Sequence, residues 1–175
     1  IVPQDTVLFN DTVEYNIAYG RPGATRAEVE EAARAARIHG FIESTPKGYQ
    51  TMVGERGLKL SGGEKQRVAI ASAIAMHTKY IVLDEPTSGQ DSEDKDQLMA
   101  LLTDLNKKGM TILIISHDMD IFAEYCQRVL VIGNHTKALD GTPQELFTQR
   151  DDLYDLGLSR PDAVTLSMAV PDFPY

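Results

Sequence analysis

The sequence lacks several features that would indicate disulfide bonds, membrane spans or secretion. It contains a single cysteine, Cys126, and no apolar run that approaches the length of a membrane span. One cysteine excludes an internal disulfide, and Cys126 has no metal-ligand partner at a useful spacing, so we interpret it as a small buried hydrophobic residue. No charged segment followed by an apolar one opens the chain in the manner of a signal peptide. We therefore expect a reducing, cytoplasmic setting.

An excess of positive charge is also missing. The 17 lysine and arginine residues stand against 26 aspartate and glutamate residues, which gives a net charge of -9. Binding to the phosphate backbone of a nucleic acid requires a basic surface, so the charge argues against a nucleic-acid partner. The 175 residues are enough for one ordinary domain with its own core and too few for two comfortable ones.

A third absence is a phosphate-binding loop. No G-x-x-x-x-G-K-[ST] motif and no Gly-Lys dipeptide occur in the sequence. The chain also begins without methionine, on "IVPQDTVLF", which has the pattern of a strand already in progress that is broken by Pro3 and resumes over residues 7–9. We therefore expect these residues to be a piece of a longer chain.

Helix and strand patterns alternate through the middle of the chain. Apolar runs predict strands over residues 80–83, 110–116 and 129–132, and residues 133–135 are predicted to turn the last of them back into 136–140. Helices are expected over residues 26–39, 62–76, 92–108 and 119–128, and from 142 onward. This alternation predicts an α/β layer with parallel strands. The end of the chain is expected to form one or two short helices and a proline-rich tail.

Polar residues that follow two of the predicted strands are candidates for a site, because ligands of parallel sheets bind beyond the carboxyl ends of the strands. Asp84 and Glu85 follow the first strand, and Ser116, His117 and Asp118 follow the second. Such a set suits attack by water on a phosphoryl group, with Asp84 holding Mg²⁺, Glu85 orienting or deprotonating the water and His117 donating to the phosphate. The alternatives are a helix-capping turn at Asp-Glu-Pro and a surface or capping role for the histidine.

The stretch "LSGGEKQRVAIA" at residues 60–71 contains another candidate site. Ser61 and Glu64 fit the S-x-x-E capping box, which needs no ligand. A capping box does not account for Gly62 and Gly63, because glycine in the first turn costs helix stability and is favoured where the backbone approaches another group closely. Backbone amides at a helix N-terminus beside a hydroxyl group predict an anion site.

These segments, in this order, resemble the motifs of the nucleotide-binding domain of ATP-binding-cassette (ABC) transporters. "LSGGEKQ" resembles the signature motif, "YIVLDEP" the Walker B strand, "SGQD" at residues 88–91 the D-loop and "ISHD" the segment with the switch histidine, while Gln4 in "VPQD" resembles the Q-loop glutamine. Each motif alone is weak, and five in the order of the family argue against coincidence. The resemblance covers residues 1–148 closely and the tail more loosely.

The resemblance implies an α/β fold with an incomplete P-loop NTPase (RecA-like) parallel sheet flanked by helices and a helical signature subdomain. The implied domains are a truncated nucleotide-binding domain over residues 1–148 and a C-terminal helical tail over 149–175. Within the first, residues 26–76 would form the helical signature subdomain, and 77–148 the α/β core from Walker B to the switch histidine.

The resemblance also implies roles for individual residues, with ATP and Mg²⁺ as cofactors. Glu85 and His117 would be catalytic, Asp84 and Gln4 would lie at the metal, and Ser61, Gly62, Gly63, Gln66 and Asp91 would bind nucleotide. Gln90 stands where the family more often has an aliphatic residue, so the D-loop departs there from the pattern.

In the family, the signature motif of one subunit closes over ATP held by the phosphate loop of the other. The resemblance therefore implies that Ser61 and Gly63 hold the nucleotide of a second nucleotide-binding domain in a head-to-tail dimer. It implies transmembrane domains as partners, a location at the cytoplasmic face of a membrane, and coupling of ATP hydrolysis to transport. Because no phosphate loop is present among these residues, we expect the chain alone not to hydrolyse ATP.

Two alternatives belong to other functional classes. One is a soluble ATPase of the same superfamily that acts in DNA repair or translation, and the other is a non-catalytic module that only contributes a signature face to a partner. The resemblance also changes along the chain: residues 1–70 resemble heavy-metal and mitochondrial half-exporters, and 71–160 the ATPases of energy-coupling-factor importers for cobalt and vitamins. We hypothesise a chimera joined near residues 69–73.

Overall fold

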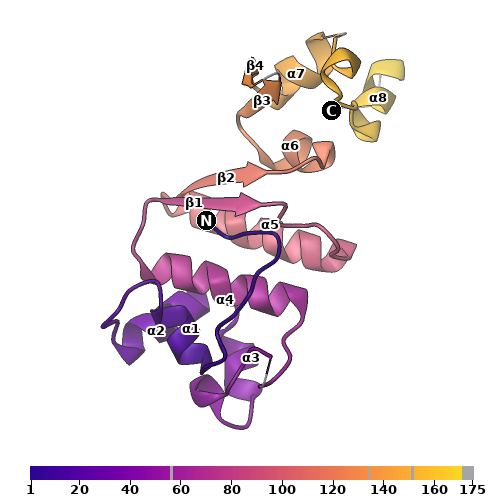
Figure 1. The fold of residues 1–175 in the computed structure, drawn as a ribbon. Helices are drawn as coiled ribbons and strands as arrows, with labels where there is room; N and C mark the ends of the chain where they lie inside the picture. The colour runs from indigo at the N-terminus through magenta and orange to yellow at the C-terminus, as the bar shows by residue number, and fades with distance from the viewer. Residues whose placement is uncertain (56, 134, 151, 171–175) are drawn as a thin grey trace. The chain divides into compact units, whose positions relative to one another are not determined.

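The computed structural model describes residues 1–55, 57–133, 135–150 and 152–170. The chain divides into two compact units, residues 1–116 and residues 117–175. Figure 1 follows the elements of each unit in chain order. Among the described residues, no helix combines the length and the apolar character needed to cross a membrane. The domain boundaries expected at 76/77 and 148/149 stay predictions.

The first half of unit 1 is helical and is built around one long helix. Its elements are α1 (Val13–Ala18), α2 (Arg26–Ala35), α3 (His39–Ser44), the 3-10 turn η1 (Gly48–Gln50) and α4 (Gly62–Ala75). Both α1 and α2 pack against α4 (Figure 1). The chain passes α4 so closely after α1 that a Cβ atom on Gly20 would lie 2.6 Å from the carbonyl oxygen of Ser72. A glycine is therefore required at that point of contact.

The helix predicted over residues 26–39 is shorter than expected. It begins at residue 26 as predicted, after a capping box formed by Thr25 and Glu28, but α2 ends at Ala35 and a separate helix begins at His39. Arg37 has a left-handed backbone with φ 55°, and the amide of Ile38 donates to the carbonyl of Ala33. This is the Schellman arrangement that closes helices, here with a buried isoleucine beyond the left-handed residue.

The second half of unit 1 has an α/β arrangement that agrees with the prediction. Strand β1 (Tyr80–Asp84) is followed by α5 (Ser92–Lys107) and by β2 (Thr111–Ile115). The two strands pair in parallel, in register from Tyr80 opposite Thr111 to Asp84 opposite Ile115. The carboxyl ends of both strands therefore lie at the same edge, which places the residues that follow them close together.

The strand expected at the start of the chain is reduced to one isolated bridge. Val2 pairs with Leu83 in parallel, with its amide donating to Val82 and its carbonyl accepting from the amide of Asp84. The predicted continuation over residues 7–9 is wrong, because these residues form no strand and the side chain of Val7 is 86% exposed. Pro3 has no amide to continue the ladder, and the chain leaves the sheet after it.

Unit 2 is built from a hairpin and short helices. Its elements are α6 (Met119–Tyr125), β3 (Val129–Gly133), β4 (Thr136–Gly141), α7 (Pro143–Gln149), the 3-10 turn η2 (Tyr154–Leu156) and α8 (Asp162–Ala169). The expectation that residues 129–132 form a third parallel strand is wrong, because β3 pairs antiparallel with β4 in a separate sheet. The predicted return of the chain into β4 is confirmed, although residue 134 of the turn lies outside the described residues.

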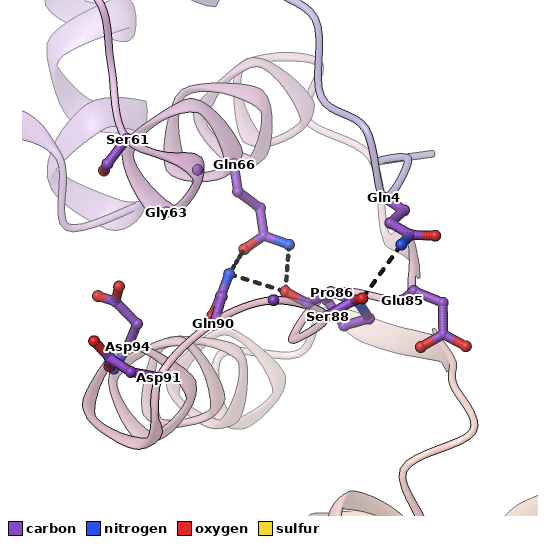
Figure 2. A pocket seen from close by; sticks show the side chains of 12 residues that line it. Gln4, Ser61, Gly63, Gln66, Glu85, Pro86, Ser88, Gln90, Asp91 and Asp94 are labelled. Carbon is purple, nitrogen blue, oxygen red and sulfur yellow. Dashed lines mark hydrogen bonds between the residues drawn. The ribbon is translucent and has the colours of Figure 1, made fainter.

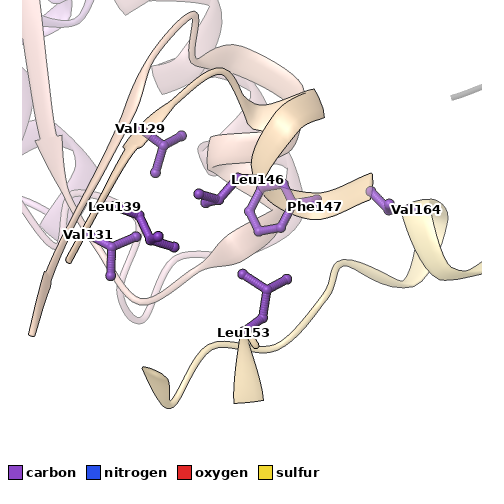
Figure 3. Packing of buried hydrophobic residues seen from close by; sticks show 7 residues of the cluster. All are labelled: Val129, Val131, Leu139, Leu146, Phe147, Leu153 and Val164. Atoms are coloured by element: carbon purple, nitrogen blue, oxygen red, sulfur yellow. The ribbon is translucent and has the colours of Figure 1, made fainter. Parts of the chain in front are cut away.

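The core of unit 2 is one apolar cluster. Figure 3 shows its members, which are Val129, Val131, Leu139, Leu146, Phe147, Leu153 and Val164. They come from the hairpin, α7, the segment before η2 and α8. Cys126 packs against this cluster, and burial raises the pKa of its thiol, which fits the expected structural role. The predicted proline-rich tail at residues 171–175 lies outside the described residues.

Candidate functional site

A pocket with a volume of about 310 Å³ lies in unit 1, beside the N-terminus of α4 (Figure 2). Its lining comes from the start of the chain, the first turn of α4, the segment between β1 and α5, and the first turn of α5. The residues are Gln4, Ser61, Gly62, Gly63, Gln66, Glu85, Pro86, Ser88, Gly89, Gln90, Asp91 and Asp94. The pocket thus brings together seven of the nine residues singled out from the sequence, all except Asp84 and His117.

The first turn of α4 begins with the predicted capping box. The hydroxyl of Ser61 accepts a hydrogen bond of 3.2 Å from the amide of Glu64, and the carboxylate of Glu64 accepts one of 2.7 Å from the amide of Ser61. A hydroxyl that accepts at a cap still carries a proton to donate. Ser61 is exposed at the pocket, so this proton can reach an acceptor from outside the chain.

The fold does not explain the two glycines that follow. A Cβ atom on Gly62 would meet no atom within 4 Å, and one on Gly63 would meet only the carboxylate of Asp94, at the ordinary contact distance of 3.8 Å. Neither glycine has a positive φ. Since amides in the first turn have no carbonyl partner within the helix, Gly62 and Gly63 present bare donors to an open space.

Gln66 lies one turn further along α4 and is 6% exposed. Its side-chain amide donates a hydrogen bond of 2.8 Å to the carbonyl of Pro86. Gln90 donates to the side-chain oxygen of Gln66 at 2.8 Å and to the same Pro86 carbonyl at 3.0 Å. Gln66 therefore holds a neighbouring segment of its own chain, and its predicted contribution to nucleotide binding can pass through that segment.

Gln4 and Asp91 take part in local contacts at the pocket. The amide nitrogen of Gln4 donates to the hydroxyl of Ser88 at 3.2 Å, which ties the start of the chain to the segment after β1. Asp91 caps α5 by accepting from the amide of Asp94 at 2.9 Å, and its predicted role at the nucleotide stays a prediction. Ser88, the first residue of the predicted D-loop, was given no role of its own, and Asp94 was not singled out; both lie three residues from Asp91, a spacing that could have identified them.

Glu85 occupies a strained position directly after β1. Its φ is 45°, in the left-handed region that residues with side chains seldom adopt, and its amide donates to the carbonyl of Ile115 at 2.8 Å. The hydroxyl of Ser116 donates to Oε2 of Glu85 at 3.0 Å. The ends of the two strands thus fix both the backbone and the carboxylate of Glu85. Strain of this kind is often retained at functional sites.

The two remaining predicted residues lie outside the pocket lining. Asp84 is the last residue of β1, half-buried, directly before Glu85. His117 is the first residue of unit 2, and its role stays a prediction. Within the described ranges, no group of three or more histidine, cysteine, aspartate or glutamate side chains has the arrangement of a metal site.

The donor types nevertheless fit Mg²⁺, which proteins commonly bind through one or two carboxylates together with substrate phosphates and water. Asp84 offers a carboxylate. Gln4 offers an amide oxygen that, among the described residues, receives no hydrogen bond, because its nitrogen makes the contact with Ser88. Figure 2 shows this oxygen directed away from Ser88.

The charge of the pocket limits how it can hold an anion. Among the residues that the structure describes, its lining contains three carboxylates, those of Glu85, Asp91 and Asp94, and no lysine, arginine or histidine. A phosphate group placed here would be attracted by the helix amides and repelled by these carboxylates. Binding of a phosphate therefore requires a cation supplied by another group.

Comparison with known proteins points to one family. The sequence profile described as "ABC transporter" matches residues 1–88. The chain is 47% identical over 154 residues to the ATM1-type heavy metal exporter of Novosphingobium aromaticivorans, covering 88% of this chain and 25% of the relative. It is 49% identical over 150 residues to heavy metal tolerance factor 1 of Caenorhabditis elegans, covering 86% and 18%. The chain thus spans about a quarter or less of the length of these curated relatives.

Alignments of this length in a chain of 175 residues necessarily cross residues 69–73. These relatives therefore align with this chain on both sides of the hypothesised junction. The likeness of residues 71–160 to importer ATPases, and the chimera built on it, stay hypotheses, to be tested by aligning the two halves separately.

A solved structure gives the same result. The structure of a bacterial Atm1-family ABC exporter with ATP bound superimposes with a TM-score of 0.76 and 41% sequence identity, over 97% of this chain and 28% of that chain. This match confirms the predicted fold class, an α/β nucleotide-binding domain of the P-loop NTPase type with parallel strands and flanking helices. From the profile match, the fold and the motifs gathered at the pocket, the chain belongs to the ABC transporter family.

Proposed function

We propose that this chain is part of an ATP-hydrolysing domain whose turnover drives transport across a membrane. Within it, the first turn of α4 binds the terminal phosphate of an ATP molecule held by a second nucleotide-binding domain. The observation that supports this most is the pair Gly62 and Gly63, which the fold itself does not require. Bare amides and the positive end of a helix are suited to a phosphate that gains charge during hydrolysis.

The residues after β1 and β2 serve a different phosphate in this proposal, one bound on the same domain. Glu85 orients and deprotonates the attacking water, and His117 donates to the transferred phosphoryl group. Asp84 and Gln4 hold Mg²⁺, which when bound neutralises charge on the phosphates. Gln66 and Asp91 contribute to nucleotide binding mainly by holding the segment between β1 and α5 in place.

The acidic lining of the pocket supports a role for a partner. Ser61 and the two glycines can donate hydrogen bonds but bring no positive charge, while three carboxylates lie around them. A phosphate that is already bound to a cationic loop and Mg²⁺ can accept hydrogen bonds from these donors, and its own cations offset the repulsion by the carboxylates. Free phosphate brings no such cations. The expected partner is a second nucleotide-binding domain arranged head to tail.

The transport function rests on the relatives, whose names describe heavy metal export and heavy metal tolerance. We propose that the domain works with transmembrane segments at the cytoplasmic face of a membrane. The transported substrate would be selected by those segments.

The test uses the full protein that contains these residues, purified in detergent or lipid. We expect Mg²⁺-dependent ATP hydrolysis, which Gly63→Asp abolishes by placing a carboxylate where the phosphate binds. The isolated chain of 175 residues is expected to show no turnover until a fragment with a phosphate loop is added. Turnover by the isolated chain, or wild-type turnover in Gly63→Asp, would contradict the proposal.

A further inference from the structure

Two glutamine side chains and one carbonyl group in the pocket lining form a small hydrogen-bond network, whose bonds are among the dashed lines in Figure 2. The carbonyl of Pro86 accepts from both Gln66 and Gln90, and the oxygen of Gln66 accepts from Gln90. We call this the Gln66–Gln90–Pro86 network. It joins α4 to the segment between β1 and α5.

The orientation of the Gln90 side chain follows from its neighbours. Both groups that it faces, the Gln66 oxygen and the Pro86 carbonyl, are acceptors, so Gln90 must turn its nitrogen toward them. Its own oxygen is then buried, and within the described part of the chain nothing donates to it. A buried acceptor without a partner is unfavourable, and an apolar side chain of similar size would remove that cost.

The positions that the network joins are all close to proposed functional groups. Gln66 lies four residues after Gly62 on α4, Pro86 follows Glu85 directly, and Gln90 directly precedes Asp91, the cap of α5. The hydrogen bonds to the Pro86 carbonyl therefore hold the peptide that follows Pro86, one residue beyond Glu85, whose φ of 45° is already strained. A shift of the first turn of α4 would be transmitted to the Glu85 carboxylate through these hydrogen bonds.

We propose that Gln90 is a positioning residue, which holds Glu85 in register with the glycine end of α4 so that phosphate binding at one place sets the geometry at the other. This inference rests on the proposed function. If Gln90 served only to fill space, an apolar residue would serve better, because the buried oxygen would not be left without a partner. We infer that glutamine is present at position 90 because its two donated hydrogen bonds outweigh the cost of its buried oxygen.

The first experiment replaces the amide without changing the length of the side chain. Gln90→Met in the full protein removes both donors and the buried oxygen together. We expect kcat for ATP hydrolysis to fall about tenfold, the effect of losing one to two neutral hydrogen bonds, while KM stays within about twofold and the thermal unfolding midpoint does not fall. A role in packing alone predicts unchanged kcat or a fall that parallels a loss of stability.

Gln97→Met is the matched control. Gln97 also joins α4 to the α5 region, by accepting from Arg67 at 2.8 Å, but it is exposed on the surface. We expect this variant to retain wild-type kcat. Gln66→Met and the double variant Gln66→Met/Gln90→Met complete a cycle, in which the double variant should lose no more than about the larger single effect, because the two amides act as one unit. If the losses of kcat in the two single variants added up in the double variant, the two amides would act independently, which would overturn the network.

A second measurement does not depend on activity. The amides of Ser88 and Gln90 donate to the carbonyls of Glu85 and Thr87 within the same segment, both at 3.2 Å. Hydrogen exchange at these amides should quicken in Gln90→Met and not in Gln97→Met. Unchanged exchange would overturn the positioning role even if kcat fell. If the wild-type full protein hydrolysed no ATP, the proposed function would fail, and this measurement would still decide whether the network holds the segment.

Discussion

The hydroxyl of Ser116, directly after β2, donates a hydrogen bond of 3.0 Å to the carboxylate of Glu85, directly after β1. The parallel register of the two strands makes this contact possible, because Asp84 and Ile115 lie opposite one another at the same edge. The backbone amide of Glu85 donates to Ile115 and its carboxylate accepts from Ser116, so the side chain has little freedom to rotate. Glu85 is therefore fixed before any substrate arrives.

We predict that Ser116→Ala in the full protein lowers kcat for ATP hydrolysis about three- to tenfold, because the Glu85 carboxylate loses a donor that orients it. Steady-state hydrolysis and equilibrium binding of a fluorescent ATP analogue measure the effect, and the binding constant should change little. Ser44→Ala, which removes an exposed hydroxyl that bonds within its own turn, is the control and should behave as wild type. Equal activity in both variants would remove Ser116 from this role.

Gly62→Ala is predicted to separate stability from function. Because its Cβ atom would meet nothing within 4 Å, the fold accepts it, and stability should rise by about 0.5–1 kcal/mol. Turnover should fall, because the methyl group stands where the phosphate of the partner must approach. Gly40→Ala, in the first turn of α3 and equally open, should raise stability without changing turnover. A more stable Gly62→Ala with unchanged turnover would count against the phosphate site.

Glu85→Gln is predicted to abolish turnover in the full protein while ATP still binds. The amide keeps the size of the side chain and the contact with Ser116, but it cannot accept a proton from water. Single-turnover hydrolysis and nucleotide binding should be measured on the same preparation, with Glu93→Gln, an exposed change in the first turn of α5, as the control. Near-normal turnover in Glu85→Gln would exclude Glu85 as the catalytic base.

The sequence predicted those parts of the fold whose signals are local. The capping box at Ser61 and the helix starts at residues 26, 62 and 92 are confirmed, because each depends on side chains within three residues of the cap. The parallel pair β1 and β2 also follows from its apolar runs and the helix between them. The motifs with glycine, serine and acidic residues located most of the pocket before any geometry was known.

The errors arose where tertiary contacts decide. Nothing in the pattern of residues 26–39 marks the left-handed Arg37, since arginine carries no conformational signal of that kind. The apolar run of β3 suits a parallel or an antiparallel strand, and its pairing with β4 decided the outcome. The contact of Gln66 with Pro86 was also missed, because the two residues are twenty positions apart in the sequence and no local pattern reveals it; the role of Gln66 at the nucleotide stays a prediction.

A pH effect is expected at the start of α2. Glu28 accepts from the amide and hydroxyl of Thr25 at 2.7 and 2.9 Å and pairs with Arg21 at 2.7 Å, and these contacts, the amide first, lower the pKa of Glu28 to about 2. Between pH 4.5, the ordinary pKa, and about pH 2, Glu28 binds more protons in the unfolded state than in the folded state. The contribution of Glu28 to folding stability is therefore fully present above pH 4.5 and is lost as the pH falls through this range.

Urea unfolding of the chain between pH 6 and about 2.5 measures this effect. Glu28→Gln should reduce the loss of stability on acidification, because the titrating group is gone. Glu31→Gln, an exposed change on the same helix, should leave the pH dependence as in wild type. Identical pH profiles for wild type and Glu28→Gln would show that the Thr25 and Arg21 contacts do not stabilise the folded state in solution.

The central claim is that the amides of Gly62 and Gly63 bind the terminal phosphate of an ATP molecule held by another domain. A structure of the full protein with Mg²⁺ and a non-hydrolysable ATP analogue tests it most directly. We predict that the terminal phosphate lies about 3 Å from these amides and from the Ser61 hydroxyl, with its loop contributed by the opposite domain. A closed, nucleotide-bound structure in which the glycines face only solvent would contradict the account.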